Sequence, residues 1–275
     1  MAKLKKQHMT IHWKAIVQDD SSIPATEATL KEKATLVGRI GLMMLSVGTG
    51  AWRVRNSMNK VSRCLGITCT ADIGLLAISY TCIEGTDTYT QSISNPTTGV
   101  NTHKLMQLEL FMKEFPDKVS TYSVKHIHEV LDEIQKLPAN YKAWNLGLAS
   151  ALACGAFTFL LGGGPVEMCC AFLGAGVGNF VRKKMLGHSI SLLANVAVSV
   201  AASCLVYVLT ILLAQSLLSV SAVHQAGYIC AMLFVIPGFP LITGGIDLAK
   251  LDLRSGLERV SYALLIILTA TMTGW

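Results

Sequence analysis

The chain has 275 residues, of which 52% are hydrophobic and only 15% are charged, and its formal net charge at pH 7 is +6. An ordinary soluble domain carries roughly 25% charged residues, so this composition argues against a wholly water-soluble protein. It also argues against a nucleic-acid-binding protein, which would need a stronger basic stripe combined with aromatic residues.

Charged residues are distributed unevenly along the chain. Residues 1–142 contain 17 Lys and Arg and 13 Asp and Glu, whereas the 62 residues 185–246 contain none of these four types. A membrane-spanning helix needs about 20 apolar residues, so this uncharged stretch is long enough for two spans and a turn. The sequence therefore predicts a mixed fold: a cytoplasmic α+β domain followed by an all-α transmembrane bundle of about five helices.

Residues 1–28 are predicted to form a flexible leader. Its lysines at positions 3, 5 and 6 suit a disordered tail or contact with anionic lipid headgroups. No signal peptide is predicted, because Gln7 and His8 follow the basic start where an apolar run would be needed.

Residues 29–140 are predicted to form the cytoplasmic α+β domain. Apolar residues recur at helical spacing in four segments, whereas Thr, Ile, Tyr and Cys enrich the segment between the second and third of them. The expected elements are helices over 30–47 and 51–65, a small antiparallel sheet within 67–93 with a turn at 84–87, and helices over 101–115 and 123–137.

Residues 141–275 are predicted to form the transmembrane domain. The turns at 162–166 and 218–223 contain no Lys or Arg, whereas the two intervening turns are basic. Basic residues remain on the cytoplasmic side of a membrane, so the alternation predicts a multi-pass protein with its N-terminus in the cytoplasm and its C-terminus outside. The expected spans are about 143–162, 165–181, 190–217, 224–244 and 257–275.

Eight cysteines are present, without a Cys-x-x-Cys pair or a regular spacing. We expect reduced, structural thiols, since the soluble domain is predicted to be cytoplasmic. His126 and His128 are two residues apart on a predicted helix and make a poor metal pair. Neither a metal site nor a cofactor is predicted.

The fourth predicted span contains a helix-breaking segment, Ile236-Pro237-Gly238-Phe239-Pro240. Each proline removes a helix donor and frees a carbonyl group, which at membrane depth is tolerated only where protein or a water-filled cavity satisfies it. Broken helices are also where secondary transporters bind their substrates. Pro237, Gly238 and Pro240 are therefore candidates for a substrate pathway, with a packing kink as the alternative.

Four polar residues complete the candidate pathway. Glu167 is the only acid within the first four predicted spans, where a charge costs about 2.5–3.5 kcal/mol, although it also lies close to the expected outer surface. Asp247 either lines the inner mouth or is a solvated acid at a helix start. Asn179 and Asn195 either face each other in the pathway or simply hold helices together.

Three sets of residues resemble the threonine/serine exporter family. In chain order, they resemble the opening of its N-terminal domain, the start of a later helix, and a Pro-Gly…Asp…Gly pattern between its last spans. The similarity covers roughly residues 30–275, and Trp52 departs from the family pattern. The sets are Gly38-Arg39-Ile40-Gly41 with Gly48-Thr49-Gly50-Ala51-Trp52-Arg53-Val54; Gly99-Val100-Asn101 with Leu105 and Leu108; and Pro237-Gly238, Asp247-Leu248 and Gly256-Leu257.

The resemblance implies a proton-driven inner-membrane exporter of threonine, serine or a related small metabolite, and some relatives export a dicarboxylate, succinate. Fuller members continue into a second membrane domain, so a separate small membrane protein is the expected partner, besides the lipid bilayer; a homo-oligomer also remains open. Two motif residues in the soluble domain, Arg53 and Asn101, are candidates, and Arg53 either forms a pair within the domain or contacts substrate.

Two alternatives to a transporter remain open at this point. A membrane-anchored enzyme would need a cluster of titratable side chains within residues 30–140, where no catalytic motif is present. A scaffold without transport activity is the other alternative.

Overall fold

The computed structural model describes residues 11, 13, 23–95, 99–138, 141–186, 190–218 and 225–275. Most of the predicted leader and nearly all of the expected turn at 218–223 lie outside this described part. The chain forms two compact units, Met1–Pro138 with Phe239–Val260, and Ala139–Gly238 with Ser261–Trp275. The sequence does not suggest that residues 239–260 group with the first unit.

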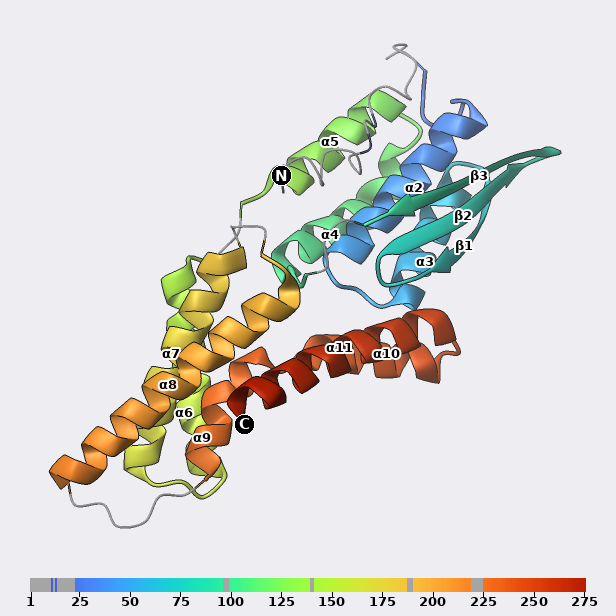
Figure 1. Cartoon of the computed structure of the whole chain (residues 1–275). Coiled ribbons are helices and arrows are strands. Elements are labelled where there is room, and N and C mark those ends of the chain that lie inside the picture. Colours follow the sequence, from blue (N-terminus) through green and yellow to red (C-terminus); the bar gives the residue numbers. More distant parts are fainter. Residues whose placement is uncertain are drawn as a thin grey trace. The chain divides into compact units, whose positions relative to one another are not determined.

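The first unit begins with two helices, α2 (Leu30–Ser46) and α3 (Ala51–Cys64), which confirm the helices predicted over 30–47 and 51–65 (Figure 1). Thr29 starts α2 with a capping box, in which its hydroxyl and its N–H both donate to Glu32, at 2.7 and 3.1 Å. Gly48 separates the helices with a φ of +94°, a conformation that residues with a Cβ rarely adopt.

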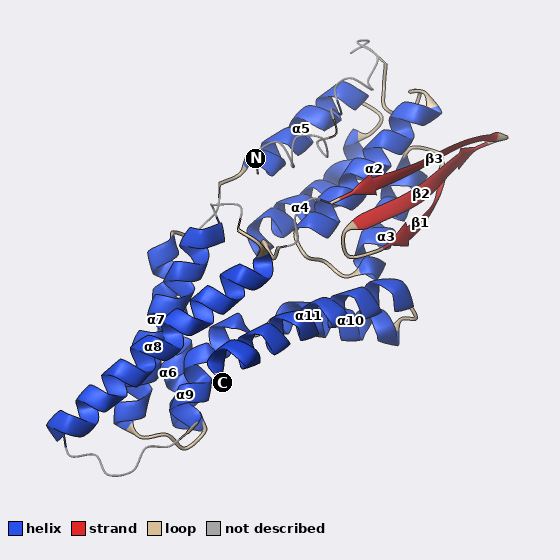
Figure 2. Ribbon diagram, in the orientation of Figure 1, coloured by secondary structure: helices blue, strands red, loops and turns tan. Residues whose placement is uncertain are grey.

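A three-stranded antiparallel sheet follows, as predicted for 67–93, with the strands in chain order (Figure 2). The strands are β1 (Thr68–Ile73), β2 (Ala77–Glu84) and β3 (Asp87–Ser94). The predicted turn joins β2 to β3, since Glu84 pairs with Asp87 in the register. The turn between β1 and β2 is not evident from the sequence.

Two further helices complete this part of the unit. Helix α4 (Thr102–Lys118) starts at Asn101, whose side chain accepts from the N–H of Lys104 at 3.0 Å, and α5 (Val124–Lys136) starts at Ser123, whose side chain accepts from the N–H of His126 at 3.2 Å. Both residues cap otherwise unsatisfied N–H groups of the first turn. The helices predicted over 101–115 and 123–137 are confirmed.

The core of the first unit is centred on α2, which lies between the sheet on one side and α4 and α5 on the other (Figure 1). Almost every α2 residue from Glu32 to Leu45 is buried, and Leu36, Ile40 and Met44 are at most 2% exposed. Each such side chain contributes about 1.5–3 kcal/mol through removal from water. The hydrophobic effect therefore stabilises this unit.

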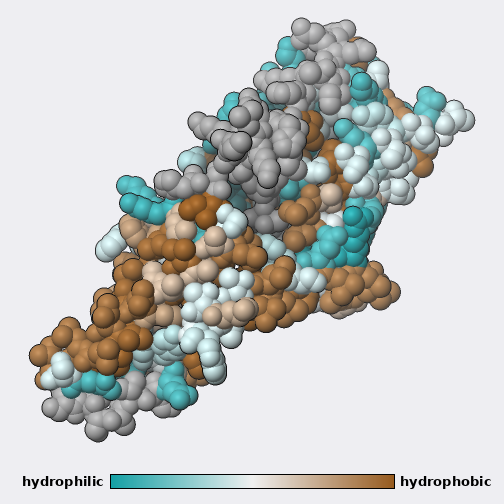
Figure 3. All heavy atoms as spheres, viewed as in Figure 1, coloured by the Kyte–Doolittle hydropathy of each residue, from teal (hydrophilic) through white to brown (hydrophobic). Residues whose placement is uncertain are grey.

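The second unit is helical in its described residues. It contains α6 (Ala143–Leu160), α7 (Pro165–Met185), α8 (Leu192–Leu218), α9 (Ala226–Met232), the short 3-10 helix η3 (Leu233–Val235) and the C-terminal part of α11 (Leu253–Gly274). Glycines bring its helices close together: a Cβ on Gly174 would lie 2.9 Å from the carbonyl oxygen of Ser203. Hydrophobic side chains cover the surface of α8 (Figure 3).

The expectation of about five spans is corrected by the described residues. Only Ala143–Leu160 and Leu192–Leu217 are long and apolar enough to cross a membrane, and the bent pair Ala226–Val235 and Gly238–Ala249 gives a third if it counts as one span. The other two predicted segments are helical but carry charges near one end: α7 ends with Arg182, Lys183 and Lys184, and α11 begins with Arg254, Glu258 and Arg259.

Candidate functional site

The helix break predicted at Pro237 is present. Helix η3 ends at Val235, and α10 (Gly238–Ala249) begins after it. Ile236 has a ψ of 121°, an extended conformation that the residue before a proline favours. The carbonyl groups that the prolines leave without a helix donor find local partners, because the N–H of Ile236 donates to Leu233 at 3.1 Å and the N–H of Gly238 donates to Ile236 at 2.9 Å.

A cation lies at this break. The guanidinium of Arg182, at the end of α7, donates through Nη1 to the carbonyl oxygen of Phe234 at 3.0 Å. Asn195 on α8 in turn donates to the carbonyl oxygen of Arg182 at 3.2 Å. The structure therefore places the guanidinium of Arg182 beside the break and joins one predicted pathway residue, Asn195, to the backbone of Arg182. In the sequence, Arg182 serves only as a marker of topology.

Asn179 does not join this group. Its side-chain amide donates to the carbonyl oxygen of Leu146 at 3.0 Å and also to the hydroxyl of Ser150, both on α6. These contacts hold α6 and α7 together, as one of the two interpretations of Asn179 expects.

Glu167 lies in the first turn of α7 and is 5% exposed. Glu167 and Tyr207 of α8 both pack against Gly227. A Cβ added to Gly227 would lie 2.9 Å from Cβ of Glu167 and 2.4 Å from the hydroxyl of Tyr207. Tyr207 is 3% exposed, and its hydroxyl has no hydrogen-bond partner among the described residues. The only acid of the second unit's described part is thus buried next to a buried phenol.

Asp247 is fully buried, within the first unit. Its carboxylate accepts from the N–H of Ala51 at 3.0 and 3.1 Å and from the hydroxyl of Ser255 at 2.9 Å, and it pairs with Arg259 at 3.2 Å. Arg259 also donates to the carbonyl oxygen of Thr49 at 2.7 Å. An anion at the first turn of α3 complements the positive end of the helix dipole.

This cluster links two of the motifs that resemble the exporter family. The Gly-Thr-Gly-Ala loop supplies a carbonyl acceptor and an N–H donor, and the Asp…Gly segment supplies the carboxylate. Gly256 lets α10 and α11 approach, since a Cβ there would lie 2.6 Å from Leu248. The sequence suggests Asp247 alone; it does not suggest Ser255 and Arg259, which lie eight and twelve positions later.

Further ionic contacts hold the α10–α11 corner against α3 and the sheet. Arg55 pairs with Asp252 at 2.6 Å, and the carboxylate of Glu258 accepts from the N–H of Leu75 at 2.6 Å. Trp52, the departure from the family pattern, lies under the ammonium group of Lys250, 4.1 Å from its ring centroid.

The two motif candidates of the α+β part have local partners. Arg53 forms an ion pair with Glu109 of α4 at 3.4 Å, and both side chains are 48% exposed. This is the internal pairing that the sequence leaves open for Arg53. Asn101 caps α4, as described above.

Comparison with known proteins now identifies the family. The model of the ThrE family of threonine/serine exporters matches residues 35–275. The chain belongs to this exporter family. Two curated relatives are both named "Probable succinate transporter subunit YjjP". No solved structure matches the exporter. The protein from Klebsiella aerogenes is 25% identical over 236 residues, covering 85% of this chain and 87% of its own. The protein from Escherichia coli K12 is 24% identical over 235 residues, which cover 85% of this chain and 88% of the relative.

The resemblance stated from the motifs is confirmed, and the chain is a transporter by family. Within the exporter, the predicted pathway residues fall into separate groups. Pro237 and Gly238 lie at the break near Arg182, whose backbone carbonyl accepts from Asn195. Glu167 lies against Gly227, and Asp247 belongs to the cluster with Arg259. Pro240 lies in the first turn of α10, beyond the break.

Proposed function

We propose that this chain is one subunit of a secondary transporter that exports a small dicarboxylate, of the succinate class, across the inner membrane. The observation that carries the proposal is a cation at a helix break inside the apolar unit: Arg182, hydrogen-bonded to the carbonyl oxygen of Phe234. Both curated relatives are named as succinate transporter subunits, which supports the same substrate class.

Arg182 suits this role for a physical reason. A guanidinium group is always charged and can form two parallel hydrogen bonds to a carboxylate. At the break, its present acceptor is a backbone carbonyl, which a substrate carboxylate can replace with a stronger, charge-assisted bond. Ile236 and Pro237 lie outside both helices, which leaves the backbone of this segment open to a substrate.

Glu167 is the proposed proton-binding group. It is buried in the second unit beside the phenol of Tyr207, and intramembrane acids commonly serve proton relays. Protonation of Glu167 would remove a buried charge, which gives the proton gradient a direct effect on this unit. We assign Asp247 a smaller part, because its carboxylate is fully engaged by Ala51, Ser255 and Arg259.

A second substrate class is threonine or serine, which the description of the family favours. A zwitterion would place its carboxylate at Arg182 and its ammonium at a backbone carbonyl of the break. Carbonyl oxygens have two lone pairs, so Leu233 and Ile236 retain acceptor capacity beside their local bonds.

We propose further that the α+β part of the first unit is cytoplasmic, with the N-terminus inside and the C-terminus outside. The basic segment 245–256 is predicted to be cytoplasmic, and in the first unit it contacts α3 and the sheet through Arg55 and Asp72, which supports the placement. A separate small membrane protein completes the transporter, as the word subunit in the relatives' names suggests. A reporter enzyme fused after Trp275 that proves active in the cytoplasm would contradict this orientation.

Flux measurements test the transport proposal. The chain would be reconstituted in liposomes, with and without the proposed partner subunit, and efflux of labelled succinate, threonine and serine would be measured under a proton gradient. We expect succinate efflux that Arg182→Gln abolishes and that Lys184→Gln, an exposed cation in the same turn, leaves intact. Threonine or serine efflux without succinate efflux would select the second class instead.

The acids are tested in the same assay. Glu167→Gln is expected to uncouple efflux from the proton gradient, whereas Asp247→Asn should act through lower protein stability. Wild-type rates in both variants would remove these acids from the mechanism.

A further inference from the structure

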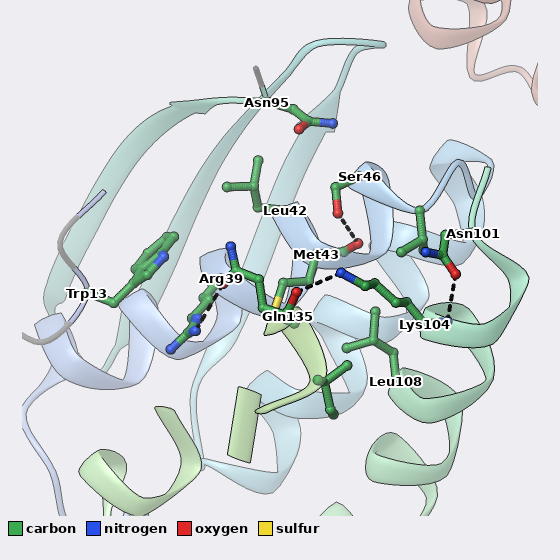
Figure 4. Close-up of a pocket in the computed structure, with 12 residues that line it drawn as sticks. Trp13, Arg39, Leu42, Met43, Ser46, Asn95, Asn101, Lys104, Leu108 and Gln135 are labelled. Carbon is green, nitrogen blue, oxygen red and sulfur yellow. Dashed lines mark hydrogen bonds between the residues drawn. The ribbon is translucent and has the colours of Figure 1, made fainter. Parts of the chain in front are cut away.

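The α+β part of the first unit contains a pocket away from the break and away from Asp247. Its volume is about 370 Å³, within the range of roughly 300–1,000 Å³ that is usual for small-molecule sites. Side chains from α2, α4 and α5 line it, together with Trp13 and Asn95 (Figure 4).

The charged side chains that line this pocket are all positive. They are Arg39 of α2 and Lys104 of α4, and the described lining residues include no Asp or Glu. Behind the pocket, Asp132 pairs with the guanidinium of Arg39 and offsets its charge. Lys104 has no acidic partner among the described residues; its ammonium donates to the carbonyl oxygen of Gln135 at 2.6 Å. The pocket therefore keeps about one unbalanced positive charge.

The guanidinium of Arg39 is buried and held by several hydrogen bonds. It is 1% exposed, and its Nη1 donates to the carbonyl oxygen and to Nδ1 of His128, each at 2.9 Å. Its Nε has no hydrogen-bond partner among the described residues. Burial lowers the pKa of Arg39, and Asp132 acts against this decrease, so the guanidinium stays charged.

The remaining lining suits an amphipathic ligand. Leu42, Met43 and Leu108 form an apolar wall, and the amide of Asn95 faces it across the pocket (Figure 4). The described lining contains no carboxylate that could pair with the ammonium of an amino acid. The chemistry favours a ligand with carboxylates and a short apolar body.

Residues from two of the family-like motifs line this pocket, and neither motif lies at the helix break. Arg39 belongs to Gly38-Arg39-Ile40-Gly41, and Asn101 to Gly99-Val100-Asn101. Gly38 lets α2 contact the sheet, since a Cβ there would lie 2.1 Å from the hydroxyl of Tyr80. By capping α4, Asn101 fixes the first turn that carries Lys104.

We propose that this pocket binds a small di- or monocarboxylate, with Lys104 as its ionic contact and the buried charge of Arg39 as a longer-range attraction. The site would make the soluble part a sensor of the cytoplasmic anion. The claim that this anion is of the transported class rests on the proposed function. The claim that the pocket binds a carboxylate is independent of the proposed function.

Equilibrium dialysis of the purified full-length chain with labelled succinate tests the proposal. We expect saturable binding that Lys104→Met weakens at least about tenfold, a change of about 1.4 kcal/mol. Lys113→Met serves as the matched control, because Lys113 is an exposed lysine of the same helix, and it should bind like the wild type. Serine should compete poorly. Because Lys104 is only half-buried, an unchanged melting temperature will show that the variant folds.

A second variant separates this pocket from the transport site. Arg182→Gln should retain the binding that Lys104→Met loses, even if no efflux is found in liposomes, so failure of the transport proposal leaves this result intact. Absence of saturable binding, equal affinity in Lys104→Met and wild type, or loss of binding in Arg182→Gln alone would each overturn the proposal.

Discussion

The two units of this exporter are stabilised in different ways. The first has one continuous core of large aliphatic and aromatic side chains around α2, including Leu36, Ile40 and Tyr80. The second has two small clusters in which Ala, Cys and Val predominate, while the leucines of α8 lie on its surface. In water the hydrophobic effect drives large side chains inward, whereas in lipid it gives helices no reason to associate.

The comparison shows where each unit is vulnerable. In the first, the core and the fully buried Asp247–Arg259 pair should dominate stability. In the second, close packing at glycines and hydrogen bonds between helices should dominate. The predictions below probe this difference.

The largest effect is expected for Asp247→Ala. The change leaves Arg259, which is 3% exposed, buried without its carboxylate. Breaking such a buried pair costs about 3–5 kcal/mol in the free energy of unfolding. Chemical unfolding of the protein in detergent would measure the loss. Glu109→Ala is the control, because it breaks the half-exposed pair with Arg53 and should cost less than about 1 kcal/mol. Equal losses would show that the buried cluster is not a stabilising element.

Leucine truncation compares the two units directly. Leu36→Ala removes a side chain with 0% exposure and should cost about 2–5 kcal/mol. Leu209→Ala alters a leucine of α8 that is 66% exposed, and it should change stability by less than about 0.5 kcal/mol. Thermal unfolding in detergent distinguishes them, and a large loss at Leu209 would indicate that this surface contacts protein.

Glycine substitution probes the close packing of the second unit. A Cβ at Gly178 would lie 2.6 Å from the ring of Phe234 and 2.8 Å from Cβ of Ser203, so Gly178→Ala should cost about 1–3 kcal/mol. Gly245 of α10, in the first unit, provides the contrast, because a Cβ there meets nothing within 4 Å. Gly245→Ala should therefore stabilise the helix by about 0.5–1 kcal/mol, and a destabilised Gly245→Ala variant would contradict the open space at this position.

The smallest effect concerns the contact between Trp52 and Lys250. An exposed cation–π contact is worth about 0.5–1 kcal/mol, so Trp52→Leu and Lys250→Gln should each lose about that amount. In a double-mutant cycle the combined variant should lose no more than either single one. Additive losses would show that the two side chains act independently.

Most elements of the first unit are predictable from the sequence because local rules decide them. Helical periodicity, the glycines after α2 and the capping residues Asn101 and Ser123 mark the helix limits to within a few residues. The break at Pro237 is predictable for the same reason, since a proline lacks the donor that a helix needs. The number of spans was predicted too high, because charged ends make α7 and α11 less apolar than a span requires.

The candidate sites were predictable only in part. Asp247 and Glu167 stand out as acids in apolar surroundings, but their partners do not. Arg259 lies twelve residues from Asp247, and Ala51 lies 196 residues away, so no local pattern connects them. In the sequence, Arg182 indicates only the membrane topology. Its contact with Phe234 depends on how α7 and η3 pack together.

The sequence by itself determined that part of this exporter is too apolar for water, where its helices break, and which family it belongs to. These properties depend on residue type and on spacing along the chain. Only the tertiary structure decided that Arg182 meets the break, that residues 239–260 join the first unit, and that Arg39 and Lys104 share a pocket. Such contacts join distant segments, and they are fixed by packing rather than by any local preference.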